Sequence, residues 1–227
     1  MTSEPVSPDI AASDAVAALA PAPVCEGCRK PEGLCVCELV EPFINRVELV
    51  ILQHPQEKDE LLGTARLTLR HFARSKLRVG LSWAGLAHAV DGPADPDRWA
   101  ILYPAGAEAP SLPPGQEIAL IDAKGAPLPN QGRLLGQLDG VIVLDGSWSQ
   151  AKTLWWRNPW VLRTRRLAIN PKEPSLYGKL RREPRRESLS TLEAAALAIS
   201  RLEQKPELEK TMRSSFRRFL QRYRDLI

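Results

Sequence analysis

The chain has 227 residues, of which 44% are hydrophobic and 26% are charged, and its formal net charge is +4. This length predicts one domain with a sizeable core and a small appendage. No stretch approaches the ~20 consecutive apolar residues of a membrane helix, which argues against a spanning protein. No Lys or Arg precedes Arg29, so the basic flank of a secretory signal is missing and we expect a cytoplasmic protein.

The basic charge is concentrated in one segment. Residues 1–24 contain three acidic residues and no basic ones, whereas residues 157–186 contain ten basic residues and two acidic ones. Such a segment favours a polyanionic partner such as nucleic acid. A solvated basic loop without a ligand is the alternative.

Three regions follow one another along the chain. Residues 1–23 are rich in Ala, Pro and Ser and have almost no large apolar side chains, so we expect a disordered tail. Residues 24–42 contain all four cysteines and form the predicted appendage. Residues 43–227 have the pattern of an α/β domain.

Within the third region, short apolar runs alternate with amphipathic segments. The apolar runs predict strands at residues 49–52, 76–81, 99–103, 117–121 and 141–144. A period near 3.6 predicts helices at residues 58–74, 148–156, 190–204 and 207–225, the last with an apolar stripe that should pack on the sheet. Apolar runs without alternation are typical of strands covered on both faces. The expected fold is therefore α/β, with a mostly parallel sheet and flanking helices.

The cysteines are spaced as Cys25-x₂-Cys28-x₆-Cys35-x-Cys37. Four thiolates so close together can supply the tetrahedral shell of a zinc ion. Disulfides are the rival interpretation, but they suit secreted proteins. Four protein ligands would leave no open position for a substrate, so we predict a structural zinc knuckle.

The clearest strand, residues 141–144, leads directly into Asp145, Gly146 and the start of a helix. An acidic residue at the carboxyl end of such a strand occupies the usual ligand crevice of an open α/β sheet. A purely structural interpretation is equally open, because Ser147 and Gln150 have the spacing of a capping box and Asp145 could stabilise the turn.

A second capping-box pattern follows at Ser190 and Glu193, and as a cap it needs no other explanation. The Gly-x-Gly-x-x-Gly fingerprint is absent, since no two glycines are separated by a single residue. This argues against an ordinary dinucleotide-binding site.

Taken together and in order, the motifs resemble those of DTW-domain proteins. They are the four-cysteine knuckle, the segment from His54 to Glu57, the segment from Asp145 to Ala151, Tyr177 with Arg181 and Arg182, and the segment from Ser190 to Ala194. The family has Thr where this chain has Ser147, which keeps the hydroxyl group. The resemblance implies a tRNA-uridine aminocarboxypropyltransferase that uses S-adenosylmethionine. It also implies a fold similar to the knotted SPOUT methyltransferases.

The implied reaction transfers the 3-amino-3-carboxypropyl group of S-adenosylmethionine to N3 of a uridine in tRNA and releases methylthioadenosine. The resemblance assigns catalysis to Asp145, Ser147 and Trp148, with Asp145 as general base or orienting acceptor. Trp148 could stack on a base, although a buried core position is the alternative. The expected cofactor-binding residues are Leu144, Gly146, Ser190, Thr191 and Glu193.

Basic residues of the charged segment suit the RNA backbone. The expected RNA-binding set is Arg165, Arg166, Lys179, Arg181, Arg182 and Arg185. His54, Glu57 and Tyr177 are further candidates, because His54 and Glu57 follow a strand end and could line the same crevice. A turn histidine without a ligand is the more common case.

Three other functions stay open at this stage. A SPOUT-like RNA methyltransferase would share the fold and the cofactor, and an aminocarboxypropyltransferase acting on rRNA would share the reaction. A zinc-containing RNA-binding protein without catalysis would keep the basic segment but would have no specific affinity for S-adenosylmethionine.

Overall fold

The computed structural model describes residues 23–102, 112–181 and 189–226. The strands are β1 (Glu48–Gln53), β2 (Ser75–Val79), β3 (Trp99–Leu102), β4 (Ile118–Ile121), β5 (Gly140–Asp145) and β6 (Arg165–Ile169). The α-helices are α1 (Ala65–Arg70), α2 (Leu86–Val90), α3 (Gln131–Gly136), α4 (Trp148–Arg157), α5 (Thr191–Leu202) and α6 (Pro206–Leu226). Short 3-10 turns are η1 (Glu32–Leu34), η2 (Cys37–Leu39), η3 (Pro55–Glu57), η4 (Pro96–Arg98) and η5 (Pro159–Arg163). In the described ranges no helix is long and apolar enough to cross a membrane.

The six strands form one sheet in the order β2-β1-β5-β3-β6-β4. All neighbouring pairs are parallel except β4 and β6, which run antiparallel. The prediction of a mostly parallel α/β sheet is therefore confirmed. β1 and β5 are neighbouring interior strands, and their carboxyl ends are in register, with Gln53 opposite Asp145.

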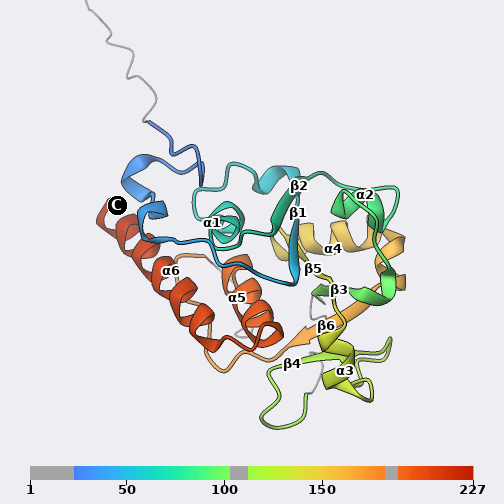
Figure 1. Ribbon diagram of the computed structural model, residues 1–227. Coiled ribbons are helices and arrows are strands. Elements are labelled where there is room, and N and C mark those ends of the chain that lie inside the picture. The colour runs from blue at the N-terminus through green and yellow to red at the C-terminus, as the bar shows by residue number, and fades with distance from the viewer. Residues whose placement is uncertain (1–22, 103–111, 182–188, 227) are drawn as a thin grey trace, which may run out of the picture.

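Helices cover both faces of the sheet (Figure 1). On one face, Leu49 and Ile51 of β1 belong to a large core with α1, α5 and α6. On the other face, Val50 and Leu52 pack in a smaller core with α2, α4 and η5. Each β1 residue from Leu49 to Leu52 is fully buried, which explains why the strand has no polar alternation.

The apolar stripe of α6 faces the core, as predicted, but it does so through another helix. The main neighbours of α6 are α5 and η1, and α5 in turn packs on β5 and β6. The long helix therefore runs along the outside of α5 and reaches the N-terminal knuckle (Figure 1).

One predicted element was wrong, and α2, α3 and β6 were not predicted. The segment predicted as a helix over 58–74 is helical only from Ala65 to Arg70, and the residues before it form turns that end at Gly63. Helix interiors disfavour Gly, which explains why the helix begins after Gly63. The Thr64 hydroxyl accepts a hydrogen bond from the backbone of Leu192.

β6 was missed because it begins with Arg165 and Arg166, and the buried apolar run that follows them is short.

Candidate active site

The centre of the site is a pair of side chains at the carboxyl edge of the sheet. The Gln53 amide nitrogen donates a 2.8 Å hydrogen bond to Oδ2 of Asp145. Oδ1 of the same carboxylate accepts a short hydrogen bond from the Thr191 hydroxyl at the start of α5. The backbone N–H of His54 also binds the Asp145 carbonyl, at 2.9 Å. Gln53 and Thr191, from two chain segments, thus fix the orientation of the carboxylate, and His54 holds its backbone.

Asp145 is buried, with 5% of its surface exposed. Burial raises the pKa of its carboxyl group, although the hydrogen bonds from Thr191 and Gln53 oppose the shift. A carboxyl group with a raised pKa, held at a strand end, is a stronger proton acceptor than an exposed one. This environment suits a general base, and the same contacts also stabilise the turn.

The turn after Asp145 begins helix α4 through a complete capping box. The Ser147 hydroxyl accepts from the backbone N–H of Gln150, and the Gln150 side chain accepts from the backbone N–H of Ser147 at 2.6 Å. Gly146 fits here because an added Cβ would lie 2.8 Å from the Cβ of Gln150. Trp148 is half-buried, with the Lys152 ammonium 5.7 Å from its ring centroid. Leu144 is half-buried against the smaller core.

Glu57 joins this turn from the segment after β1. Its buried carboxylate accepts a 3.1 Å hydrogen bond from the backbone N–H of Ser147 and lies 2.9 Å from Nη2 of Arg181 through both oxygens. Arg181 also lies over the Tyr177 ring at 5.8 Å. His54 caps η3, its Nδ1 accepting from the backbone N–H of Gln56 at 3.3 Å. The structure therefore brings Glu57 and Arg181 to the site as an ion pair.

Tyr177 is fully buried and donates a 2.6 Å hydrogen bond from its hydroxyl to the Leu62 carbonyl. Burial raises the pKa of this phenol above its usual value. These contacts give Tyr177 a packing role beneath Arg181.

The start of α5 is a second complete capping box. Ser190 accepts from the backbone N–H of Glu193, and the Glu193 carboxylate accepts from the backbone N–H and the hydroxyl of Ser190. The same carboxylate also binds Ser175, the backbone N–H of Leu176 and the guanidinium of Arg213. Of the three residues predicted here, Thr191 contacts Asp145, whereas Glu193 points into the protein interior.

The predicted RNA-binding residues that the structure describes make separate contacts. Arg165 pairs with Asp97 at 2.8 Å, and Arg166 lies 5.8 Å from the Trp155 ring on the neighbouring helix. Lys179 is exposed. Arg182 and Arg185 lie outside the described residues.

The four cysteine sulfurs all lie within 4.8 Å of one another. A tetrahedral zinc ion with Zn–S bonds of about 2.3 Å places its sulfurs about 3.8 Å apart. The Cys25 and Cys37 sulfurs are 3.9 Å apart, which matches that spacing. Burial raises the pKa of the Cys28 thiol to about 11, so a bound cation would be needed to hold this sulfur as a thiolate. The cluster fits one metal ion.

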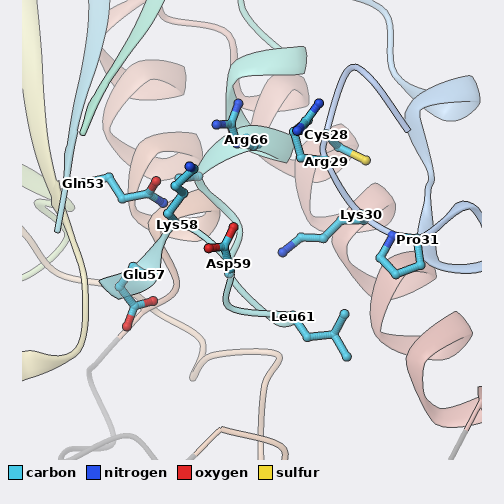
Figure 2. A pocket seen from close by; sticks show the side chains of 12 residues that line it. Cys28, Arg29, Lys30, Pro31, Gln53, Glu57, Lys58, Asp59, Leu61 and Arg66 are labelled. Carbon is cyan, nitrogen blue, oxygen red and sulfur yellow. The ribbon is translucent and has the colours of Figure 1, made fainter. Parts of the chain in front are cut away.

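Two residues near this edge of the sheet, Gln53 and Lys30, were not predicted from the sequence. Gln53 ends β1 as a polar residue after four apolar ones, which is the signal that could have identified it. Lys30 lies within the cysteine knuckle and is nevertheless buried, with its ammonium 2.6 Å from the Glu60 carbonyl. Burial lowers the pKa of Lys30 to about 8. Both residues line a pocket between the knuckle and the segment after β1 (Figure 2).

Comparison with known proteins places this geometry in context. The family model of the DTW domain matches residues 22–224. The chain is 28% identical over 200 residues to tRNA-uridine aminocarboxypropyltransferase 2 of Macaca fascicularis. It is 29% identical over 195 residues to the protein of that name from Mus musculus, and 28% over 198 residues to that from Drosophila melanogaster. No solved structure matches the chain.

These alignments cover 83–84% of this chain. They cover 60% of the two mammalian proteins and 70% of the fly protein. The chain therefore spans about 60% of the length of its mammalian relatives.

Proposed function

This chain belongs to the DTW domain family, and from that membership and the buried Asp145 we propose that it is a tRNA-uridine aminocarboxypropyltransferase. The donor is S-adenosylmethionine and the acceptor is N3 of a uridine. In the transfer, the bond between sulfur and the γ-carbon of the donor breaks and a bond from N3 to that carbon forms. The sulfur keeps the electron pair, so methylthioadenosine leaves.

The observation that carries the proposal is the environment of Asp145. N3 of uridine is weakly acidic, so the ring must lose a proton before it becomes a useful nucleophile. Asp145 accepts that proton, and burial supports this role because it raises the pKa of the carboxyl group. Gln53 and Thr191 hold the carboxylate in one orientation, which avoids reorganisation during the reaction. Ser147 and Trp148 begin the adjoining helix, where Trp148 stacks on the base.

The orphaned oxygen of Gln53 supports a bound co-substrate. Gln53 is buried, and its Oε1 has no hydrogen-bond partner within the described part of the chain. Leu144 and Gly146 flank Asp145 in the chain, and the Thr191 hydroxyl contacts its carboxylate; together with Ser190 they form the proposed cofactor site. Glu193 contributes by holding the start of α5 in place through its capping box.

The proposed knuckle metal is zinc, held by Cys25, Cys28, Cys35 and Cys37. Its role is structural, because four protein ligands complete a tetrahedral shell. The SPOUT-like knot is likewise part of the proposal, and it rests on the family resemblance.

The exposed Lys179 and the neighbouring basic segment contact the tRNA backbone in this proposal. Phosphate contacts make binding depend on salt, so Lys179→Ala should weaken tRNA binding for all sequences alike. It should also reduce the slope of log affinity against log salt concentration by about one. An unchanged slope would show that Lys179 does not contact the tRNA backbone.

The reaction is tested with tRNA and two forms of labelled S-adenosylmethionine. Label in the carboxyl carbon should enter the tRNA, whereas label in the methyl group should remain in methylthioadenosine. Mass spectrometry of the nucleosides then identifies the modified uridine. Transfer of the methyl label would instead indicate a SPOUT-like methyltransferase, and transfer to rRNA alone would change the substrate. No transfer and no affinity for S-adenosylmethionine would leave an RNA-binding protein.

A further inference from the structure

The pocket between the cysteine knuckle and the segment after β1 has a volume of about 220 Å³. Figure 2 shows Lys30 reaching into it from the knuckle and Gln53 from the end of β1, with Asp59 between them in this view. Pockets for drug-sized ligands usually measure roughly 300–1,000 Å³. This pocket is therefore suited to a small head group rather than to a whole nucleoside with its side chain.

The pocket wall contains a hydrogen-bond acceptor that needs a donor. The nitrogen of the Gln53 amide is committed to the Asp145 carboxylate, and this contact fixes which end of the amide is the oxygen. The remaining Oε1 is buried and has no partner among the described residues. A buried acceptor without a partner is costly, so a ligand that brings an N–H group would be favoured here.

The pocket also attracts an anion. Four basic residues line it against two acidic ones, and one of these acids, Glu57, is already paired with Arg181. The basic residues are Arg29, Lys30, Lys58 and Arg66. Lys30 is the buried member of this set, and its contact with the Glu60 carbonyl uses one of its three donors.

We propose that this pocket binds the α-ammonium and α-carboxylate groups of the transferred aminocarboxypropyl chain. The Gln53 oxygen accepts from the ammonium group, and Lys30 pairs with the carboxylate. An amino-acid head group carries both a donor and an anion on one carbon, which matches the two requirements of the pocket. This inference rests on the proposed function, because it names where the methionine end of the donor lies.

The position of the pocket relative to Asp145 agrees with the reaction. One side-chain amide connects them, since Gln53 lines the pocket and its nitrogen donates to Asp145. A head group held at Gln53 would therefore place the chain that follows it beside the proposed proton acceptor. The Gln53 side chain would then bind the head group of S-adenosylmethionine and also orient Asp145.

Isothermal calorimetry with two nucleosides tests the proposal. S-adenosylmethionine carries the head group, and methylthioadenosine lacks it. Gln53→Met and Lys30→Met should each weaken the binding of S-adenosylmethionine by about tenfold or more, as expected for a lost hydrogen bond to a charged group. Methylthioadenosine should bind each variant as it binds the parent. Lys124→Met, at an exposed lysine outside the pocket, is the matched control and should change neither affinity.

Thermal unfolding and the methylthioadenosine affinity together show that each variant is folded. The proposal would be overturned if the variants bound both nucleosides equally more weakly, or bound S-adenosylmethionine as the parent does. It would also be overturned if the variants lost affinity only for uridine monophosphate, because the pocket would then hold the acceptor base. If the parent bound neither nucleoside, the proposed function would fail as well. A parent that binds S-adenosylmethionine but transfers its methyl group overturns the proposed function only.

Discussion

Gln53 and Asp145 end neighbouring parallel strands, and the Gln53 side chain donates a 2.8 Å hydrogen bond to the Asp145 carboxylate. Two adjacent strands of a parallel sheet necessarily present their final residues at the same edge. The register between β1 and β5 thus places an amide directly beside the acid. This pairing connects the pocket at the knuckle with the turn that begins α4.

The first prediction concerns the charge of Asp145. Asp145→Asn keeps the size of the side chain and removes its ability to accept a proton, so uridine modification should fall by about 10²–10⁴. Binding of S-adenosylmethionine and tRNA should change far less, because a proton acceptor acts mainly in the transition state. Single-turnover product formation at saturating donor measures the effect. Turnover within about threefold of the parent would assign Asp145 to the turn alone.

The second prediction concerns the ion pair between Arg181 and Glu57. Glu57 is 5% exposed at its side chain and Arg181 is 26% exposed. Arg181→Ala leaves a buried carboxylate with one backbone donor, so the free energy of unfolding should fall by about 3 kcal/mol. Denaturant unfolding gives this value.

The exposed pair of Arg98 and Asp139 is the control for Arg181. Their side chains are about half exposed, at 48% and 47%, and their atoms approach to 2.6 Å. Arg98→Ala should therefore cost less than about 1 kcal/mol, because exposed ion pairs are weak. Equal losses at the two sites would show that burial of Glu57 does not set the cost.

The third prediction concerns the knuckle metal. Purified protein should contain one zinc ion, and chelation should unfold residues 24–40 locally, because metal binding supplies the folding energy of such a small segment. Elemental analysis measures the zinc, and hydrogen exchange measures the local unfolding. Protein purified without chelator that contains no zinc would contradict the assignment.

The sequence predicted the sheet better than the loops around it, for a physical reason. β1 and β5 are covered on both faces, so each is a continuous apolar run that is visible without a structure. β6 is equally buried at Leu167 and Ala168, yet its first two residues are arginines with partners at the sheet edge. A strand with a charged start resembles a loop when only composition is considered.

The position of the candidate site could be predicted from the sequence, but the contacts between its residues could not. Asp145 follows a clear strand and was therefore predicted at the crevice. Its partners Gln53 and Thr191 are 92 and 46 residues away along the chain, and no local spacing connects them. Arg181 was expected at the RNA backbone because it lies in a basic run. Its contact with Glu57 is set by tertiary structure alone.

The fourth prediction concerns His71, which is 1% exposed and lies 2.8 Å from the Ser215 hydroxyl through Nε2. Burial lowers the pKa of this imidazole to about 4, from an ordinary value near 6.5. Above pH 6.5 neither the folded nor the unfolded form binds the proton. As the pH falls from 6.5 to about 4, the unfolded form binds it first, and stability falls by up to about 3 kcal/mol. Denaturant unfolding across this range measures the loss. His71→Gln keeps a hydrogen-bonding group and cannot titrate, so its stability should depend less on pH than that of the parent, since every other ionisable group is shared. Parallel curves for the two proteins would show that His71 contributes nothing to the acid sensitivity.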